Sequence, residues 1–129
     1  MMRTLVLAAL VAMGMAISGQ RAQAVSLDGE WSGKGYVQPT QGAREQVHCR
    51  VRYTRQSGRV FSVVATCATS SFKIRQTGEV LMVTPTRYVG DFHNAEFDVS
   101  GRIRVIVAGT RQTVTLSGRA GQGSLTLSK

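Results

Sequence analysis

The segment from Glu45 to Ala68 is the feature that most constrains how this chain can fold. Its two halves, Glu45–Arg55 and Arg59–Ala68, carry apolar residues at alternate positions, and Ser57-Gly58 lies between them. Alternation with a period of two is typical of half-buried antiparallel strands, and a serine-glycine pair is typical of the turn that joins them. The segment therefore predicts a long β-hairpin.

Both cysteines of the chain lie in this hairpin. Folding about Ser57-Gly58 places Cys49 opposite Cys67 or one residue away, which is near enough for a cross-strand bridge if the local geometry allows it. The alternation also places both cysteines on the core side. The predicted inward-facing residues of the two arms are Val47, Cys49, Val51, Tyr53, Phe61, Val63, Ala65 and Cys67.

The N-terminal residues, 1–24, are typical of a secretory signal peptide. Arg3 gives a positive start, Leu5–Ile17 is an apolar run, and Ala22-Gln23-Ala24 fits a small-x-small cleavage site. The apolar run is shorter than the roughly 20 residues that a membrane-spanning helix needs. We therefore predict cleavage after Ala24, a periplasmic or secreted protein that does not span a membrane, and one domain over residues 25–129. In that oxidising setting, an even pair of cysteines favours a structural disulfide.

The first strand is predicted over Gly29–Val37. Alternation places Trp31 on one face together with two glycines, which let a strand bend sharply or let another segment pack closely. We expect this tryptophan to close one end of a barrel. Gln38–Gly42, which contains Pro39, is predicted to be a loop.

The turn sequence of the hairpin recurs further along the chain. Arg55–Val60 and Arg75–Val80 are nearly identical, Val99–Ile103 resembles them, and their three glycines are spaced by 20 and 23 residues. A period of this size fits two strands and their turns, so the three glycines are predicted to mark successive hairpins. A further turn is predicted at His93-Asn94, between strands over Arg87–Phe92 and Ala95–Val99.

The chain as a whole is predicted to be all-β. No stretch has a helical period, and turn signals recur about every 8 to 12 residues, as in small barrels and sandwiches. Short connections between successive strands favour an up-and-down barrel, which also removes exposed sheet edges. We therefore predict a single small antiparallel β-barrel of eight or nine strands with one cross-strand disulfide.

The charge of the chain is strongly positive. The whole sequence has a formal net charge of +9, and residues 25–129 keep +7, because residues 1–24 contribute Arg3 and Arg21 and no acidic residue. Such an excess favours encounter with anionic partners. The alternative interpretation is that it only keeps the protein soluble. Three pairs of basic residues spaced i, i+2 are predicted to project outward from strands. They would form one basic stripe if the pairs were adjacent, and would otherwise be distributed around the barrel exterior. The pairs are Arg50 and Arg52, Lys73 and Arg75, and Arg102 and Arg104, with His48 beside the first.

Catalytic and cofactor motifs are missing from the sequence. No serine lies in a nucleophile elbow, no glycine-rich loop opens a helix, and His48 has no evident orienting partner for general-base chemistry. Aromatic residues do not interleave with the basic ones as nucleic-acid stacking requires, so nucleic acid is not an expected partner. We predict a protein that is not an enzyme and needs no cofactor. A metal site remains a remote alternative, built from Asp91, His93, Glu96 and Asp98.

Two resemblances bear on the fold. The segment Leu27-Asp28-Gly29-Glu30-Trp31 resembles the G-x-W start of the lipocalin and avidin-like barrels. Together with the His48-Cys49 pair and Cys67, it is also similar to the small periplasmic inhibitors of bacterial serralysin-type metalloproteases, over the chain from Leu27 to Cys67. This resemblance implies an eight-stranded barrel with a Cys49–Cys67 disulfide. In that family the segment before the barrel, here Val25–Asp28, enters the protease cleft.

These observations predict an exported bacterial binding protein of the cell envelope. It would act, like a protease inhibitor, on a protein or anionic envelope component through its basic surface or the barrel mouth. The alternative is a lipocalin-like carrier of a small amphipathic or anionic ligand, which an open apolar cavity would support and a filled interior would exclude. The candidate binding surface consists of Trp31, His48, Arg50, Arg52, Lys73, Arg75, Arg102 and Arg104.

Overall fold

The computed structural model describes Gly14 and residues 26–129, and these residues form eight β-strands. The strands are β1 (Gly29–Pro39), β2 (Glu45–Arg55), β3 (Val60–Ala68), β4 (Lys73–Thr84), β5 (Arg87–Asn94), β6 (Val99–Ala108), β7 (Arg111–Gly118) and β8 (Gly121–Ser128). The predicted signal peptide lies outside the described residues. Within the described part of the chain, no helix has the length and apolar character needed to cross a membrane.

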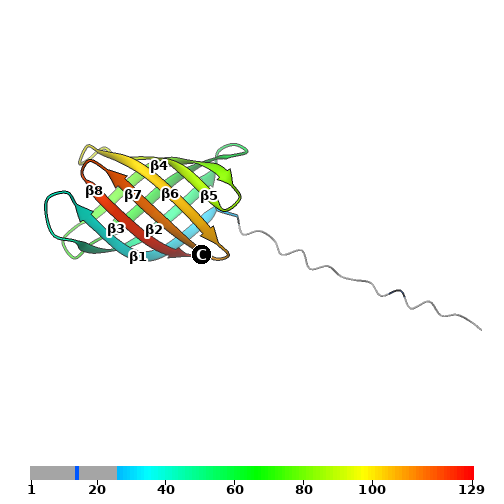
Figure 1. The fold of residues 1–129 in the computed structure, drawn as a ribbon, viewed down its shortest axis with the longest axis horizontal. Coiled ribbons are helices and arrows are strands. Elements are labelled where there is room, and N and C mark those ends of the chain that lie inside the picture. The colour runs from blue at the N-terminus through cyan, green and yellow to red at the C-terminus, as the bar shows by residue number, and fades with distance from the viewer. Residues whose placement is uncertain (1–13, 15–25) are drawn as a thin grey trace, which may run out of the picture.

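The strands form one closed antiparallel barrel. Each strand pairs with the next in sequence, and β1 pairs with β8 to complete the ring, which confirms the predicted up-and-down topology. The β1–β2, β3–β4, β5–β6 and β7–β8 connections lie at one end of the barrel (Figure 1). The three other turns lie at the opposite end, together with the C-terminus. We call the end with the β1–β2 connection the open end and the end with the C-terminus the closed end.

The core lies in the barrel interior, which is filled by side chains from alternate positions of the strands. In β2 and β3 the inward-facing positions are the predicted ones, and the basic residues that alternate with them on β2 face solvent. Every strand contributes inward-facing side chains, because a closed barrel has only one inner face. The fully buried large side chains include Trp31, Phe61 and Leu127.

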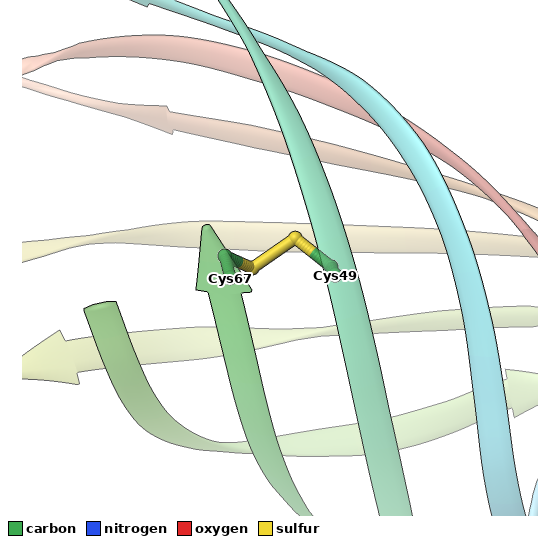
Figure 2. The surroundings of a disulfide bond; sticks show 2 residues. All are labelled: Cys49 and Cys67. Atoms are coloured by element: carbon green, nitrogen blue, oxygen red, sulfur yellow. A yellow bond between two sulfur atoms is a disulfide. The ribbon is translucent and has the colours of Figure 1, made fainter. Parts of the chain in front are cut away.

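The predicted disulfide joins β2 to β3. The hairpin register places Cys49 directly opposite Cys67, and their Sγ atoms are bonded at 2.05 Å (Figure 2). Both residues face the interior, in the half of the hairpin away from the Ser57-Gly58 turn. The bridge therefore holds together the two strand ends that the turn does not hold.

The prediction that three glycines mark hairpins was wrong for two of them. Gly58 lies in the β2–β3 turn, but Gly78 is in the middle of β4 and Gly101 is in the third position of β6. Both are register partners of Phe92 on the intervening β5. A Cβ atom added to Gly101 would lie 2.6 Å from Cε1 of that ring. Gly101 therefore makes room for an inward-pointing aromatic ring. Gly78 instead permits close approach of the β5 backbone, since an added Cβ atom would lie 2.5 Å from the Asp91 carbonyl oxygen and 3.1 Å from the Phe92 Cα.

Two other predicted boundaries were also wrong. The first strand extends through Pro39, which pairs with Gly121 of β8; a proline is tolerated at a strand end because few ladder hydrogen bonds are lost there. The β5–β6 turn follows Asn94 rather than including it. The Asn94 side chain is buried, and its Oδ1 accepts a hydrogen bond from the Phe97 N–H at 3.1 Å, which organises the turn over 95–98.

Removing the disulfide should destabilise the barrel without changing its topology. The bridge closes a loop with a sequence separation of 18 residues. Its loss in a Cys49→Ala/Cys67→Ala variant should lower the free energy of unfolding by about 3 kcal/mol, measured by urea denaturation. Wild-type protein under reducing conditions should show a similar loss. An unchanged denaturation midpoint in both samples would contradict the stabilising role.

The role of Gly101 in leaving space for the Phe92 ring is also testable. A Gly101→Ala change places a Cβ atom 2.5 Å from the Ser117 carbonyl oxygen as well as against the ring. We expect a loss of about 1–3 kcal/mol in the free energy of unfolding, as for overpacked cores. The matched control is Gly58→Ala, where no atom lies within 4 Å of the added Cβ. Equal stability of the two variants would refute the packing role.

Candidate functional site

The closed end of the barrel is sealed by the segment that precedes β1. Leu27 and Trp31 are each only 1% exposed, and the Trp31 Nε1–H donates a hydrogen bond to the Leu27 carbonyl oxygen at 2.9 Å. Lys129 Nζ donates to the carbonyl oxygens of Ser26 and Asp28 at 2.8 and 2.6 Å, which ties the C-terminus over the same segment. Trp31 therefore closes one barrel end as predicted, and it does not belong to the exposed binding surface in which we also placed it.

One polar pair lies inside the core near this end. The Tyr53 hydroxyl donates a hydrogen bond to Gln112 Oε1 at 2.6 Å, and both side chains are buried. Burial raises the pKa of the Tyr53 phenol well above its ordinary value, so the group stays neutral and remains a donor. Gln112 Nε2 has no hydrogen-bond partner among the described residues. The pair fixes the orientation of β2 relative to β7 across the interior.

The opposite end of the barrel contains a cavity of about 490 Å³. Its apolar wall includes Val37, Ile74, Phe92, Val99 and Leu116, which reach it from five different strands. The polar residues among those that line the cavity are Gln38, Gln76, Asn94, Ser100 and Gln122. None of the described residues that line the cavity carries a charge.

Small residues account for the width of this cavity. On the β7–β8 side four of the lining residues, Gly118, Ala120, Gly121 and Gly123, have no side chain larger than a methyl group, and Leu116 is the large apolar side chain there. Phe92 and Leu116 form the floor, because they also line a smaller void of about 30 Å³ deeper in the barrel. The cavity is thus a blind pocket, open at one barrel end and closed at the other by the Leu27–Trp31 seal.

Two aromatic rings stand at the mouth of the pocket. Phe72 in the β3–β4 loop and Phe97 in the β5–β6 turn are 43% and 53% exposed, and their ring centroids are 6.5 Å apart. Exposed rings next to an apolar pocket form a continuous apolar surface from its rim inward. Sequence reasoning missed this rim because it placed Phe97 in a strand over Ala95–Val99, whereas the structure places it in the turn over 95–98. The glycine-rich run over 118–123 was a visible signal that one wall would lack side chains.

The predicted basic residues are only partly brought together. Arg50 and Arg75 are the register partners of Thr66, one on each side of β3. His48 and Lys73 flank Ala68 in the same way. The pairs on β2 and β4 therefore share one outer face.

The third basic pair lies elsewhere on the barrel. Arg102 and Arg104 are on β6, beyond β5, and Arg102 Nε is 3.8 Å from Asp91 Oδ1. The basic stripe thus contains two of the three predicted pairs. Within it, Arg52 bonds Glu30 at 2.7 Å, and this hydrogen bond lowers the pKa of the Glu30 carboxyl.

The four residues of the remote metal alternative do not converge. Asp91 and His93 point outward from β5, where Asp91 faces Arg102 and His93 Nδ1 lies 2.8 Å from Ser100 Oγ. Glu96 and Asp98 lie in the following turn. Over residues 26–129, no group of three or more His, Cys, Asp or Glu side chains is placed to hold a metal ion.

No protein family model matches this sequence. No curated protein matches it either, so the resemblance to serralysin inhibitors is not confirmed. The fold does match solved structures. A redesigned β-barrel, mFAP1, bound to DFHBI, has a TM-score of 0.67 and 14% identity, covering 80% of this chain and 94% of that one.

Two further designed barrels match in the same way. The redesigned barrel mFAP0, bound to DFHBI, has a TM-score of 0.65 and 15% identity, with 80% and 98% of the two chains covered. A de novo designed fluorescence-activating β-barrel has a TM-score of 0.61 and 10% identity, with 79% and 92% covered. At these identities the likeness establishes the barrel fold alone.

Proposed function

We propose that this protein is a non-catalytic binding protein, exported to the cell envelope, that holds a small apolar or amphipathic molecule in the open end of its barrel. The observation that carries the proposal is the blind apolar pocket of about 490 Å³. Ligand sites are typically concave, largely apolar and about 300–1,000 Å³ in volume, with a few polar groups that orient the ligand. The proposed export rests on the signal-peptide pattern of residues 1–24.

The pocket wall indicates the kind of molecule. Its deep part is apolar, whereas the amide groups of the inward-facing Gln76 and Asn94 lie among the apolar side chains. Burying a charge there would be costly because no lining residue has an opposite charge. We therefore favour an uncharged ligand, or one whose charged head stays outside beyond Phe72 and Phe97. The barrels mFAP1 and mFAP0, bound to DFHBI, support this proposal as examples of the same architecture with a bound molecule.

The inhibitor-like alternative has less support. In the resembling inhibitors the segment before the barrel enters the protease cleft. Here Leu27 in that segment is 1% exposed. The Trp31 side chain donates a hydrogen bond to the Leu27 carbonyl oxygen, and the Lys129 side chain donates to those of Ser26 and Asp28. Releasing it would uncover the barrel interior, since Leu27 is part of the core. We therefore place ligand binding at the mouth above protease inhibition.

Filling the pocket should abolish ligand binding. We propose the neutral fluorescent probe N-phenyl-1-naphthylamine, whose emission rises in apolar surroundings. Val99 faces the pocket near the start of β6, so Val99→Trp should occupy the space that the probe needs. We expect the Kd for the probe to rise at least about tenfold, which corresponds to about 1.4 kcal/mol.

The matched control is Ile106→Trp on the same strand. Ile106 is 53% exposed on the outer face, so the same new side chain there leaves the pocket unchanged. Probe affinity should then remain within about twofold of the wild type, with thermal unfolding measured for both variants to confirm folding. Failure of the wild type to bind neutral apolar probes, or equal affinity in the two tryptophan variants, would refute the proposal.

A further inference from the structure

The outer face of the barrel over β1 to β4 carries a groove that is separate from the pocket. The outward residues of β3 are short, namely Val64, Thr66 and Ala68. At Thr66 and Ala68 the strands on both sides carry basic side chains at the matching register positions, and at Val64 only β2 does, with Arg52. A row of short side chains between two rows of long ones leaves a channel with cationic walls. We call this the β3 groove.

The register defines the walls of the β3 groove. Arg50 on β2 and Arg75 on β4 face each other across Thr66, and their backbones are two strand spacings apart, about 10 Å. His48 and Lys73 face each other across Ala68 one step along. Lys34 on β1 adjoins His48 and extends the basic surface by one strand.

Two surface hollows confirm that the face is concave. One of about 460 Å³ is lined by His48, Arg50 and Lys73, among others. The other, of about 740 Å³, is lined by Arg50, Arg52, Arg75 and Lys129. Both hollows are lined by Ser32, Arg50 and Thr66, so they adjoin one another over β1 to β3.

The charges of the β3 groove are poorly compensated within the protein. The chain has seven Asp and Glu residues, and only Glu30 lines either hollow, where it bonds Arg52. Among the described residues, Arg50, Lys73 and Arg75 have no acidic group within 4.0 Å. Their side chains are also exposed. Uncompensated cations focused in a depression attract anions more strongly than the same charges spread over a convex surface.

We propose that the β3 groove binds a linear polyanion with closely spaced phosphate groups, independently of any ligand in the pocket. Several cations in register along a channel need several anionic groups in a row to neutralise them, which one free phosphate cannot supply. Arginine offers a planar, bidentate donor pair that matches phosphate. Neither hollow is lined by any of the exposed large apolar side chains of the described residues, so insertion into a lipid surface is not favoured.

The test uses the protein without its predicted signal peptide, residues 25–129, with inorganic polyphosphate as the probe. Binding is followed by titration at several salt concentrations. The logarithm of the association constant should fall linearly with the logarithm of salt concentration, because counterions are released. Inorganic phosphate at an equal total phosphate concentration should compete at least tenfold more weakly than polyphosphate, and so should polyglutamate, which tests the preference for phosphate over carboxylate.

The decisive comparison is between two variants with the same change in charge. Arg50→Gln/Lys73→Gln/Arg75→Gln removes the groove walls, and affinity for polyphosphate should fall at least tenfold with a smaller salt slope. Arg87→Gln/Arg102→Gln/Arg104→Gln removes three exposed cations from β5 and β6, and affinity should change less than threefold. Both variants should keep the wild-type affinity for N-phenyl-1-naphthylamine if the pocket binds that probe, and the wild-type circular dichroism spectrum in any case.

Three outcomes would overturn the inference. Equal losses in the two triple variants would show attraction by net charge alone. Equal affinity for polyglutamate and polyphosphate would remove the phosphate preference. Tighter binding of single-stranded oligothymidylate than of polyphosphate of the same charge would assign the groove to nucleic acid instead.

Discussion

Every other feature of this protein depends on the pairing of β1 with β8, which closes the sheet into a ring. The pairing demands a close approach of the two backbones, since a Cβ atom added to Gly35 would lie 2.8 Å from the Leu125 Cα and would also meet the Ser124 carbonyl oxygen. Glycine permits this approach, because it has no side chain to hold the strands apart. Closure pairs both edges of the sheet and gives all eight strands one common interior.

The two ends of that interior differ because the side chains facing it differ in size. At one end Trp31, Phe61 and Tyr88 fill the barrel, and the Phe61 and Tyr88 rings meet edge to face with centroids 5.5 Å apart. At the other end Gly121 and Gly123 take the place of large residues, and space remains. Protein interiors are otherwise filled to crystal-like density, so an open apolar space of this size supports the proposed binding role.

The sizes of side chains on neighbouring strands also determine the shape of the outer surface. A hollow forms where short residues of β3 lie between long ones of β2 and β4, and the long ones happen to be basic. Inside and outside therefore provide two different environments on one small scaffold, one apolar and uncharged, the other cationic. The two proposed ligands, one apolar and one anionic, would therefore contact different residues.

Periodicity alone determined the fold class, the inward and outward faces of the Glu45–Ala68 hairpin and the closeness of Cys49 to Cys67, because these depend on residues near in sequence. It misplaced turns at Gly78 and Gly101, since a glycine that makes room for a neighbouring backbone or an aromatic ring looks like a glycine in a turn. Only the tertiary structure decided where the pocket and the β3 groove lie. Both arise from the sizes and charges of side chains that the ring closure and strand register bring together from separate strands, and a sequence read in order does not contain that register.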